Sequence, residues 1–138
     1  MRTVTIAGRA VPAPNEVYVI AEAGVNHNGD LALAHRLVDV AADSGADAVK
    51  FQTFDPAKLV SAAAASTPYQ RRLGGSPDQR SLLNALTLPS KAWVELRDHA
   101  TEVGITFLST PFDLDSAEML AGLGLPALKV SSGELTNL

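Results

Sequence analysis

Short apolar runs alternate with stretches of helical periodicity along most of this chain, and this alternation limits the fold more than any other feature. The apolar runs are residues 18–24, 48–54, 105–109 and 127–132. Apolar residues at helical spacing predict helices over 31–41, 93–103 and 113–123, each followed closely by a glycine that favours a helix end. Strands that alternate with helices form a parallel sheet through right-handed crossovers. The sequence therefore predicts an α/β fold.

Two segments depart from this alternation. Near the start, Val4–Ile6 and Val11 flank the turn residues Gly8 and Arg9, a pattern that predicts a small β-hairpin. We therefore expect an N-terminal hairpin over 1–15 and a (β/α) domain over 16–138. The connection over 55–89 is unusually long, with a short helix expected near 79–86. A connection of this length inside a compact domain is usually functional or mobile.

The number of strand–helix units indicates half of a larger architecture. A complete TIM (β/α)8 barrel has eight strands and about 250 residues. The four strands expected within 138 residues correspond to strands 1–4, the first half of such a barrel, with a small open sheet as the alternative. We expect the chain to be truncated before the barrel closes and to be inactive alone. Open edges at the first and fourth strands would favour self-association.

The composition excludes several kinds of partner. There are 15 acidic and 11 basic residues and a net charge of −4, whereas nucleic-acid binding requires a basic surface. The sequence contains no cysteine, so disulfides and thiolate metal sites are excluded and a cytoplasmic location is expected. No run approaches the roughly 18 apolar residues of a membrane span, and no signal peptide is recognisable. No His, Asp or Glu pair has metal-ligand spacing, so no metal ligand is predicted.

Polar residues interrupt strands that should be almost continuously apolar in a parallel sheet. They lie at or near the carboxyl ends of the strands: Glu22, Lys50, Gln52, Ser109, Thr110, Lys129 and Ser131. The active sites of (β/α) folds are built at this end. An ammonium group buried without a partner is costly. We therefore expect Lys50 and Lys129 to converge on a small anion that carries a phosphate and a carboxylate.

These residues also have structural interpretations, which stay open. Either lysine could extend to the strand end and pair with Glu22 or Glu134, and Gln52 could be a satisfied core amide. Glu22 would handle a proton or act as a counter-ion. His27, in the loop after the first strand, either takes part in the site or orders the loop through a hydrogen bond. Two further histidines in helical segments, His35 and His99, are interpreted as solvated surface residues.

Four segments resemble the sialic acid synthase (N-acetylneuraminate synthase, NeuB-type) family. They are IAEAGVNHNGD (20–30), DAVKFQTF (47–54), FLSTPFD (107–113) and KVSSGELTNL (129–138), in the same order as in the family. The resemblance covers nearly all of residues 18–138. It implies the N-terminal half of a TIM barrel, which a small antifreeze-like domain follows in the family. It also implies homodimers in which the partner's antifreeze-like domain closes the barrel mouth.

The resemblance further implies a phosphoenolpyruvate-dependent transferase of carbohydrate biosynthesis that forms a carbon–carbon bond. Such enzymes join phosphoenolpyruvate to N-acetylmannosamine or a related N-acetylated sugar, giving a nonulosonic (sialic) acid and phosphate. By resemblance, four residues match phosphoenolpyruvate-binding positions: Lys50, Thr110, Lys129 and Ser132. Gln52 matches a position that contacts the sugar, and Glu22 and Glu134 match active-site acids. The family uses a divalent metal, manganese or magnesium, whose two histidine ligands come from later strands that this chain lacks.

Two other functions remain as alternatives. Lysines inside barrels also act as nucleophiles of Schiff-base aldolases, and Lys50 or Lys129 could serve in that way. Trapping with borohydride would support this alternative, and metal dependence with phosphate release would exclude it. A non-catalytic half-barrel that only binds an anion or a partner is the second alternative.

Overall fold

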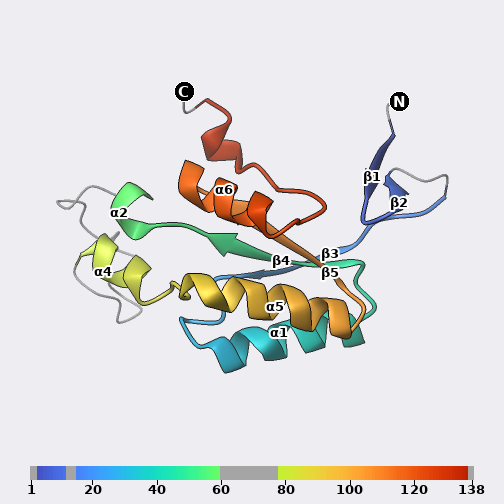
Figure 1. Ribbon diagram of the computed structural model, residues 1–138, viewed down its shortest axis with the longest axis horizontal. Coiled ribbons are helices and arrows are strands. Elements are labelled where there is room, and N and C mark those ends of the chain that lie inside the picture. The colour runs from blue at the N-terminus through green and yellow to red at the C-terminus, as the bar shows by residue number, and fades with distance from the viewer. Residues whose placement is uncertain (1–2, 12–14, 60–77, 137–138) are drawn as a thin grey trace.

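A parallel sheet of three strands forms the centre of the molecule. The computed structural model describes residues 3–11, 15–59 and 78–136. The strands pair in the order β3 (Ile20–Gly24), β4 (Ala48–Thr53) and β5 (Thr106–Pro111). Helices α1 (Leu31–Asp43) and α5 (Ser90–Glu102) connect these strands and lie side by side along them, and α6 (Leu114–Gly122) follows β5 (Figure 1). The (β/α) units expected for the first half of a TIM barrel are therefore present.

Side-chain carboxylates begin the helices that follow the strands. Asp30 Oδ1 accepts hydrogen bonds from the backbone N–H groups of Ala32 and Leu33, at 2.8 and 3.2 Å, at the start of α1. Asp113 accepts the N–H of Ser116 at 2.9 Å at the start of α6. These bonds satisfy N–H groups that the helix itself leaves without partners. The caps fix where the chain turns from each strand end into its helix.

The hydrophobic core lies between the sheet and the helices α1 and α5. On the sheet it contains Val49, Phe51 and Phe107, and the Phe51 ring lies 5.5 Å from Phe107 and 6.2 Å from Trp93 of α5. The helices contribute the buried residues Ala34, Val38, Ala41, Ala92, Leu96 and Ala100. Successive side chains of a strand point to opposite faces. Because Phe51 points into this core, Lys50 and Gln52 point to the other face of the sheet.

The N-terminal hairpin is attached to the base of the sheet by one arginine. Strands β1 (Val4–Ile6) and β2 (Arg9–Val11) pair antiparallel around a two-residue turn, as the sequence predicts. Arg9 forms ion pairs with Asp47 and with Glu16 and lies over the Tyr18 ring, 5.5 Å from its centroid. The second carboxylate oxygen of Asp47 accepts the Val19 N–H at 2.6 Å. Asp47 therefore joins the hairpin, the segment before β3 and the segment before β4.

Replacing Asp47 by alanine is expected to lower the free energy of unfolding by about 1–2 kcal/mol, because hydrogen bonds to a charged group are lost. Urea unfolding of the chain measures this loss. The matched control is Asp43→Ala: Asp43 is exposed in the last turn of α1, where a carboxylate opposes the helix dipole. The control should lose no stability. Equal stabilities of the two variants would contradict the role given to Asp47.

The prediction of a fourth strand over 127–132 is wrong. The structure has instead a single parallel bridge between Ser109 and Leu128, with the Lys129 N–H donating to the Ser109 carbonyl at 3.2 Å. A short 3-10 turn, η1 (Ser132–Glu134), follows. Pro126 offers no N–H for pairing before the bridge, and in the described part of the chain no strand pairs with this segment on its outer side. One-sided pairing leaves it extended and largely exposed.

The long connection over 55–89 is described at its two ends. It begins with α2 (Pro56–Leu59), which the sequence analysis did not anticipate, and it contains α4 (Gln79–Asn84) where a short helix was expected. Residues 60–77 lie outside the described residues. None of the helices described is long and apolar enough to cross a membrane.

Candidate functional site

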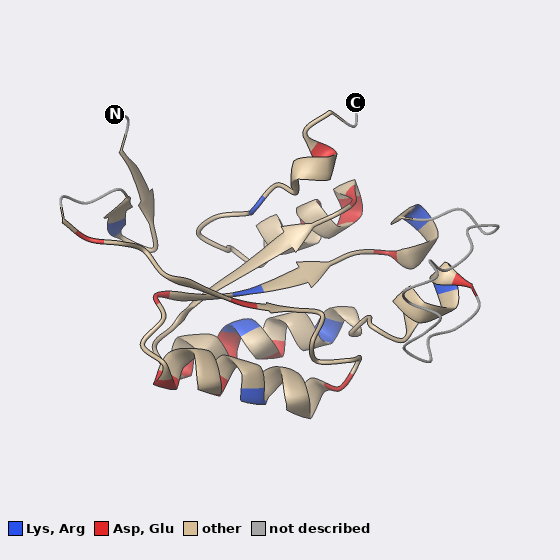
Figure 2. Cartoon of the chain, turned by 180° about the vertical axis from the view of Figure 1, so that it is seen from behind, with Lys and Arg blue, Asp and Glu red and all other residues tan. Residues whose placement is uncertain are grey.

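The carboxyl ends of the strands bring a lysine, a carboxylate and a hydroxyl group together. Glu22 of β3 lies opposite Lys50 of β4 in the sheet register, and their side chains form an ion pair. Lys50 Nζ also donates to Thr110 Oγ1 of β5 at 3.4 Å. In Figure 2 the basic segment of β4 lies beside the acidic segment of β3, on otherwise uncharged strands. Three strands thus contribute one side chain each to a single polar cluster.

The three groups differ in burial, and the ammonium of Lys50 is the charged group that is most shielded from water. The Lys50 side chain is 12% exposed, whereas that of Glu22 is 48% exposed. Thr110 is buried. An ammonium so enclosed interacts strongly with a second anion, because little water screens it. The cluster can therefore hold a small anion between Lys50 and Thr110, with Glu22 as the counter-ion in its absence.

Gly24 allows the chain to pass close to this cluster. Its φ is +55°, a left-handed conformation that side-chain-bearing residues rarely adopt. A Cβ atom at this position would lie 3.2 Å from Glu22 Oε1 and 3.6 Å from Gln52 Nε2. Gln52 therefore lies near Glu22, on the same face as Lys50. The sequence analysis did not single out Gly24, although a glycine at a strand end is a signal for close approach.

A pair of hydroxyl groups lies on the opposite face of the sheet. Ser109 Oγ and Thr53 Oγ1 are 2.8 Å apart and both residues are buried. They alternate with Thr110 and Gln52, so they point toward the helices. Ser109, which belonged to the polar set at the strand ends, satisfies its hydroxyl group there and is a structural residue.

The remaining predicted site residues lie after β5 and outside any strand. Lys129 follows Leu128, whose bridge to Ser109 places it on the helix side, so backbone alternation puts Lys129 on the face of Lys50 and Thr110. Lys129 and Ser132 are exposed and Glu134 is half-buried. The contacts seen at the strand ends join Glu22, Lys50 and Thr110, and the convergence of Lys129, Ser132 and Glu134 on them stays a prediction.

The entrance to the long connection is tied to α6 by a network around Asp113. This carboxylate accepts the Asp55 N–H at 2.8 Å and the Ser116 hydroxyl at 2.7 Å. Burial opposes ionisation of Asp113, but the hydrogen bonds from Ser116 and Asp55 outweigh it and hold its pKa below the ordinary value. Lys58 of α2 forms an ion pair with Asp115 of α6. These bonds keep α2 against α6 beside the carboxyl end of β4.

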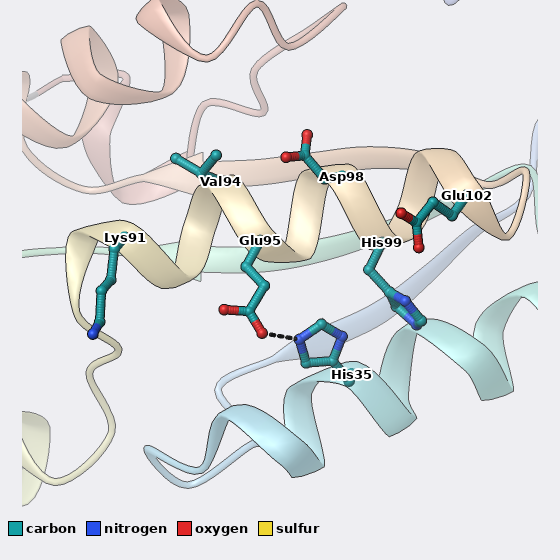
Figure 3. Close-up of a pocket in the computed structure, with 7 residues that line it drawn as sticks. All are labelled: His35, Lys91, Val94, Glu95, Asp98, His99 and Glu102. Atoms are coloured by element: carbon teal, nitrogen blue, oxygen red, sulfur yellow. Dashed lines mark hydrogen bonds and ion pairs between the residues drawn. The ribbon is translucent and has the colours of Figure 1, made fainter.

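A second group of titratable side chains lies in a groove between α1 and α5, shown in Figure 3. His35 Nε2 is 3.0 Å from Glu95 Oε1, and His99 Nε2 is 2.6 Å from Asp39 Oδ1. The two imidazole rings are 4.6 Å apart. Their side chains are 23% and 24% exposed and each faces a carboxylate, so both lie half-buried at the surface and are paired rather than freely solvated. The pairs join the two helices on the outer surface, away from the strand ends.

The described residues offer no ligand set for the divalent metal that the resemblance implies. Within residues 3–11, 15–59 and 78–136, no three His, Cys, Asp or Glu side chains lie so that they could hold a metal ion. Both histidines of the groove already face carboxylates from opposite helices.

Comparison with known proteins places this chain in a family. Residues 37–138 match the NeuB family model. Over 121 residues the chain is 51% identical to the N,N'-diacetyllegionaminic acid synthase of Campylobacter jejuni, a match that covers 87% of this chain and 36% of the relative. It is 33% identical over 130 residues to the N-acetylneuraminate-9-phosphate synthase of Homo sapiens, covering 94% of this chain and 36% of the relative.

A solved structure agrees with these matches. The N-acetylneuraminic acid (sialic acid) synthetase of Leptospira borgpetersenii, in complex with citrate, superposes with a TM-score of 0.80 at 32% identity. The match covers 99% of this chain and 43% of that chain. This chain spans about a third of the length of the curated relatives that it matches. Because the family model covers most of its residues, the chain belongs to the NeuB family.

Proposed function

We propose that this chain carries the phosphoenolpyruvate-binding part of a sialic-acid-type synthase. The observation that carries the proposal is the shielded ammonium of Lys50, held between Glu22 and Thr110 at the carboxyl end of the sheet. A parallel (β/α) sheet places ligands at this end. Family membership adds the reaction class, since relatives named as synthases of legionaminic and neuraminic acids are 51% and 33% identical to this chain over most of its length.

Phosphoenolpyruvate carries a phosphate and a carboxylate, and the cluster offers charged and neutral donors for both. Lys50 would hold one anionic group together with the Thr110 hydroxyl, and Lys129, on the same face, would hold the other. The Ser132 hydroxyl would add a further donor. Donors fixed in a shielded site stabilise developing negative charge more strongly than water does. The related synthetase of Leptospira borgpetersenii was solved in complex with citrate, which is itself a polyanion.

The proposed reaction joins C3 of phosphoenolpyruvate to the aldehyde carbon of the open-chain sugar. The new carbon–carbon bond leaves positive character at C2, to which a water molecule adds with loss of a proton. The bond between C2 and the phosphate oxygen then breaks, releasing inorganic phosphate and leaving the keto acid. Glu22 would give the proton that the aldehyde oxygen takes up, or accept the one that the water loses, with Glu134 as a second acid. Gln52, near Glu22, would contact the sugar.

The sugar is proposed to be N-acetylmannosamine or a related N-acetylated amino sugar. Two relatives named N,N'-diacetyllegionaminic acid synthase are 51% and 48% identical to the chain, against 33% for the human N-acetylneuraminate-9-phosphate synthase. This difference favours a sugar with two acetamido groups. The homodimer, the divalent metal, the cytoplasmic location and the inactivity of this chain by itself belong to the same proposal.

The arrangement at Lys50 favours anion binding over the Schiff-base alternative. A lysine that forms a Schiff base attacks as a neutral amine. In the structure the Lys50 ammonium instead forms an ion pair with Glu22. A cation held by a carboxylate can exchange that partner for a ligand carboxylate or phosphate without leaving a charge unpaired.

Titration calorimetry with phosphoenolpyruvate tests the proposal on this chain directly. The chain should bind phosphoenolpyruvate, inorganic phosphate should compete, and no covalent adduct should form with pyruvate and borohydride. Absence of phosphoenolpyruvate binding would overturn the proposed function. A borohydride-trapped adduct on Lys50 or Lys129 would establish the aldolase alternative instead.

A further inference from the structure

His27 is a fully buried histidine for which the proposed reaction has no use. It lies in the loop between β3 and α1 and is 0% exposed. Its Nδ1 accepts the Gly29 N–H at 3.1 Å, so the ring is neutral and its proton lies on Nε2. The His27 carbonyl accepts the N–H of Asp30, the cap of α1, at 2.8 Å. The bond between His27 Nδ1 and the Gly29 N–H confirms the loop-ordering hydrogen bond that the sequence analysis left as one alternative.

The ring is wedged between two aromatic residues of the core. Its centroid lies 6.0 Å from Phe51 of β4 and 6.4 Å from Trp93 of α5, with its plane almost perpendicular to the indole. Next to it, a Cβ atom on Gly29 would lie only 2.6 Å from the Ala85 carbonyl oxygen. The loop is therefore packed against β4, α5 and the end of the long connection at the same time.

The same loop begins at the polar cluster. Gly24 ends β3, and the space above it is bounded by Glu22 Oε1 and Gln52 Nε2. Phe51, which contacts His27 from the core side, lies in the chain between Lys50 and Gln52. A change in the path of residues 25–29 would therefore alter the turn at Gly24, and with it the space in which Glu22 meets Lys50.

We propose that His27 is a positioning residue of the anion site: its buried neutral ring holds the 25–29 loop in the path that keeps Glu22 and Gln52 in place beside Lys50. The proposal rests on the proposed function, in that Lys50 is taken to bind an anion. The Nε2–H has no hydrogen-bond partner among the described residues, which is a second indication, because a buried donor without an acceptor is costly and persists only where the surroundings impose it.

Protonation of His27 would undo this arrangement. An imidazolium carries a hydrogen on Nδ1, which would then face the Gly29 N–H donor. The rings packed against it, Phe51 and Trp93, are uncharged, and burial alone lowers its pKa. Above the ordinary histidine pKa of 6.5, His27 is neutral and its contribution to stability is fully present. This contribution is lost as the pH falls through the lowered pKa of the folded state. Acid should loosen the loop and weaken anion binding.

The test measures the affinity of this chain for sulfate by calorimetry from about pH 8 to about pH 5.5, where histidine changes its charge and sulfate does not. His27→Phe keeps a ring but removes the acceptor and the titration. His27→Asn keeps an oxygen near the position of Nδ1. His35→Asn, in the outer groove, is the control. Circular dichroism and thermal melting confirm that each variant is folded.

The wild type should lose sulfate affinity several-fold toward the acid end, and the His35→Asn control should follow it. His27→Phe should bind about 5-fold more weakly at neutral pH, the effect of one lost hydrogen bond, with a flat pH profile. His27→Asn should recover most of the affinity with the same flat profile. Phosphoenolpyruvate at neutral pH should rank the variants in the same order.

Wild-type affinity and pH dependence in His27→Phe would overturn the positioning role. If His27→Phe does not fold, His27→Asn decides, since an unchanged pH profile in that variant contradicts the proposal. Failure of the wild type to bind sulfate or phosphoenolpyruvate, or equal binding by Lys50→Met, would instead show that the proposed anion site is wrong. The two failures are therefore distinguishable.

Discussion

Replacing Lys50 by methionine is expected to weaken phosphoenolpyruvate binding by this chain about 30-fold or more. Methionine keeps an unbranched apolar stem in the enclosed position, so the change removes the charge and little packing. It also leaves the Glu22 carboxylate without its partner and facing the incoming anion. Removing one member of an enclosed charge pair costs about 2–5 kcal/mol in binding, and each 1.4 kcal/mol is tenfold in affinity.

The matched control is Lys91→Met, which makes the same chemical change at an exposed position on α5, in the outer groove. Calorimetry should show wild-type affinity in the control and no measurable heat in Lys50→Met at concentrations that saturate the wild type. Binding within about fivefold of wild type in Lys50→Met would contradict the site, because a single exposed ion pair contributes no more than that. Comparable losses in both variants would indicate a general charge effect.

Patterns within a few residues determine much of this fold, and the elements that they determine were predicted correctly from the sequence. Asp30 lies directly after an Asn–Gly turn and caps α1, and the hairpin turn lies between alternating residues. Lys50 and Gln52 interrupt an apolar run at a spacing of two, which places both on one face of a strand. Each of these conclusions depends on neighbours within a few residues, which is the range over which a sequence pattern determines structure.

The errors arose where distant parts of the chain decide the outcome. The segment around Lys129 has the composition of a strand, but it pairs with β5 through one bridge and lacks a second neighbour in the described residues. His35 and His99 look like surface residues until α1 and α5 are brought side by side. The burial of His27 depends on Phe51 and Trp93, which no local pattern connects to it. These features depend on packing between elements that are distant in the sequence.

The core and the anion site use opposite faces of the same strand, so a substitution that leaves the core largely filled should spare the site. Phe51 is completely buried, stacks on Phe107 at 5.5 Å and contacts Trp93 at 6.2 Å. Phe51→Ala should lower the free energy of unfolding by about 3–5 kcal/mol, because the buried apolar area of the ring is lost and the residues around the resulting cavity lose dispersion contacts. Domains of this size have about 5–15 kcal/mol of stability, so the variant would be close to unfolding.

Urea unfolding followed by the fluorescence of Trp93, the single tryptophan of the chain, measures this loss at the core itself. Leu114→Ala is the control, since Leu114 is 81% exposed and should change stability by less than about 0.5 kcal/mol. Phe51→Leu should cost less than Phe51→Ala and stay folded. Because Lys50 and Gln52 project from the other face of β4, and leucine still packs against His27 on the core face, Phe51→Leu should bind phosphoenolpyruvate within about threefold of wild type. If Phe51→Leu folds but does not bind, the site and the core are not independent, and the anion site depends on the packing beneath β4.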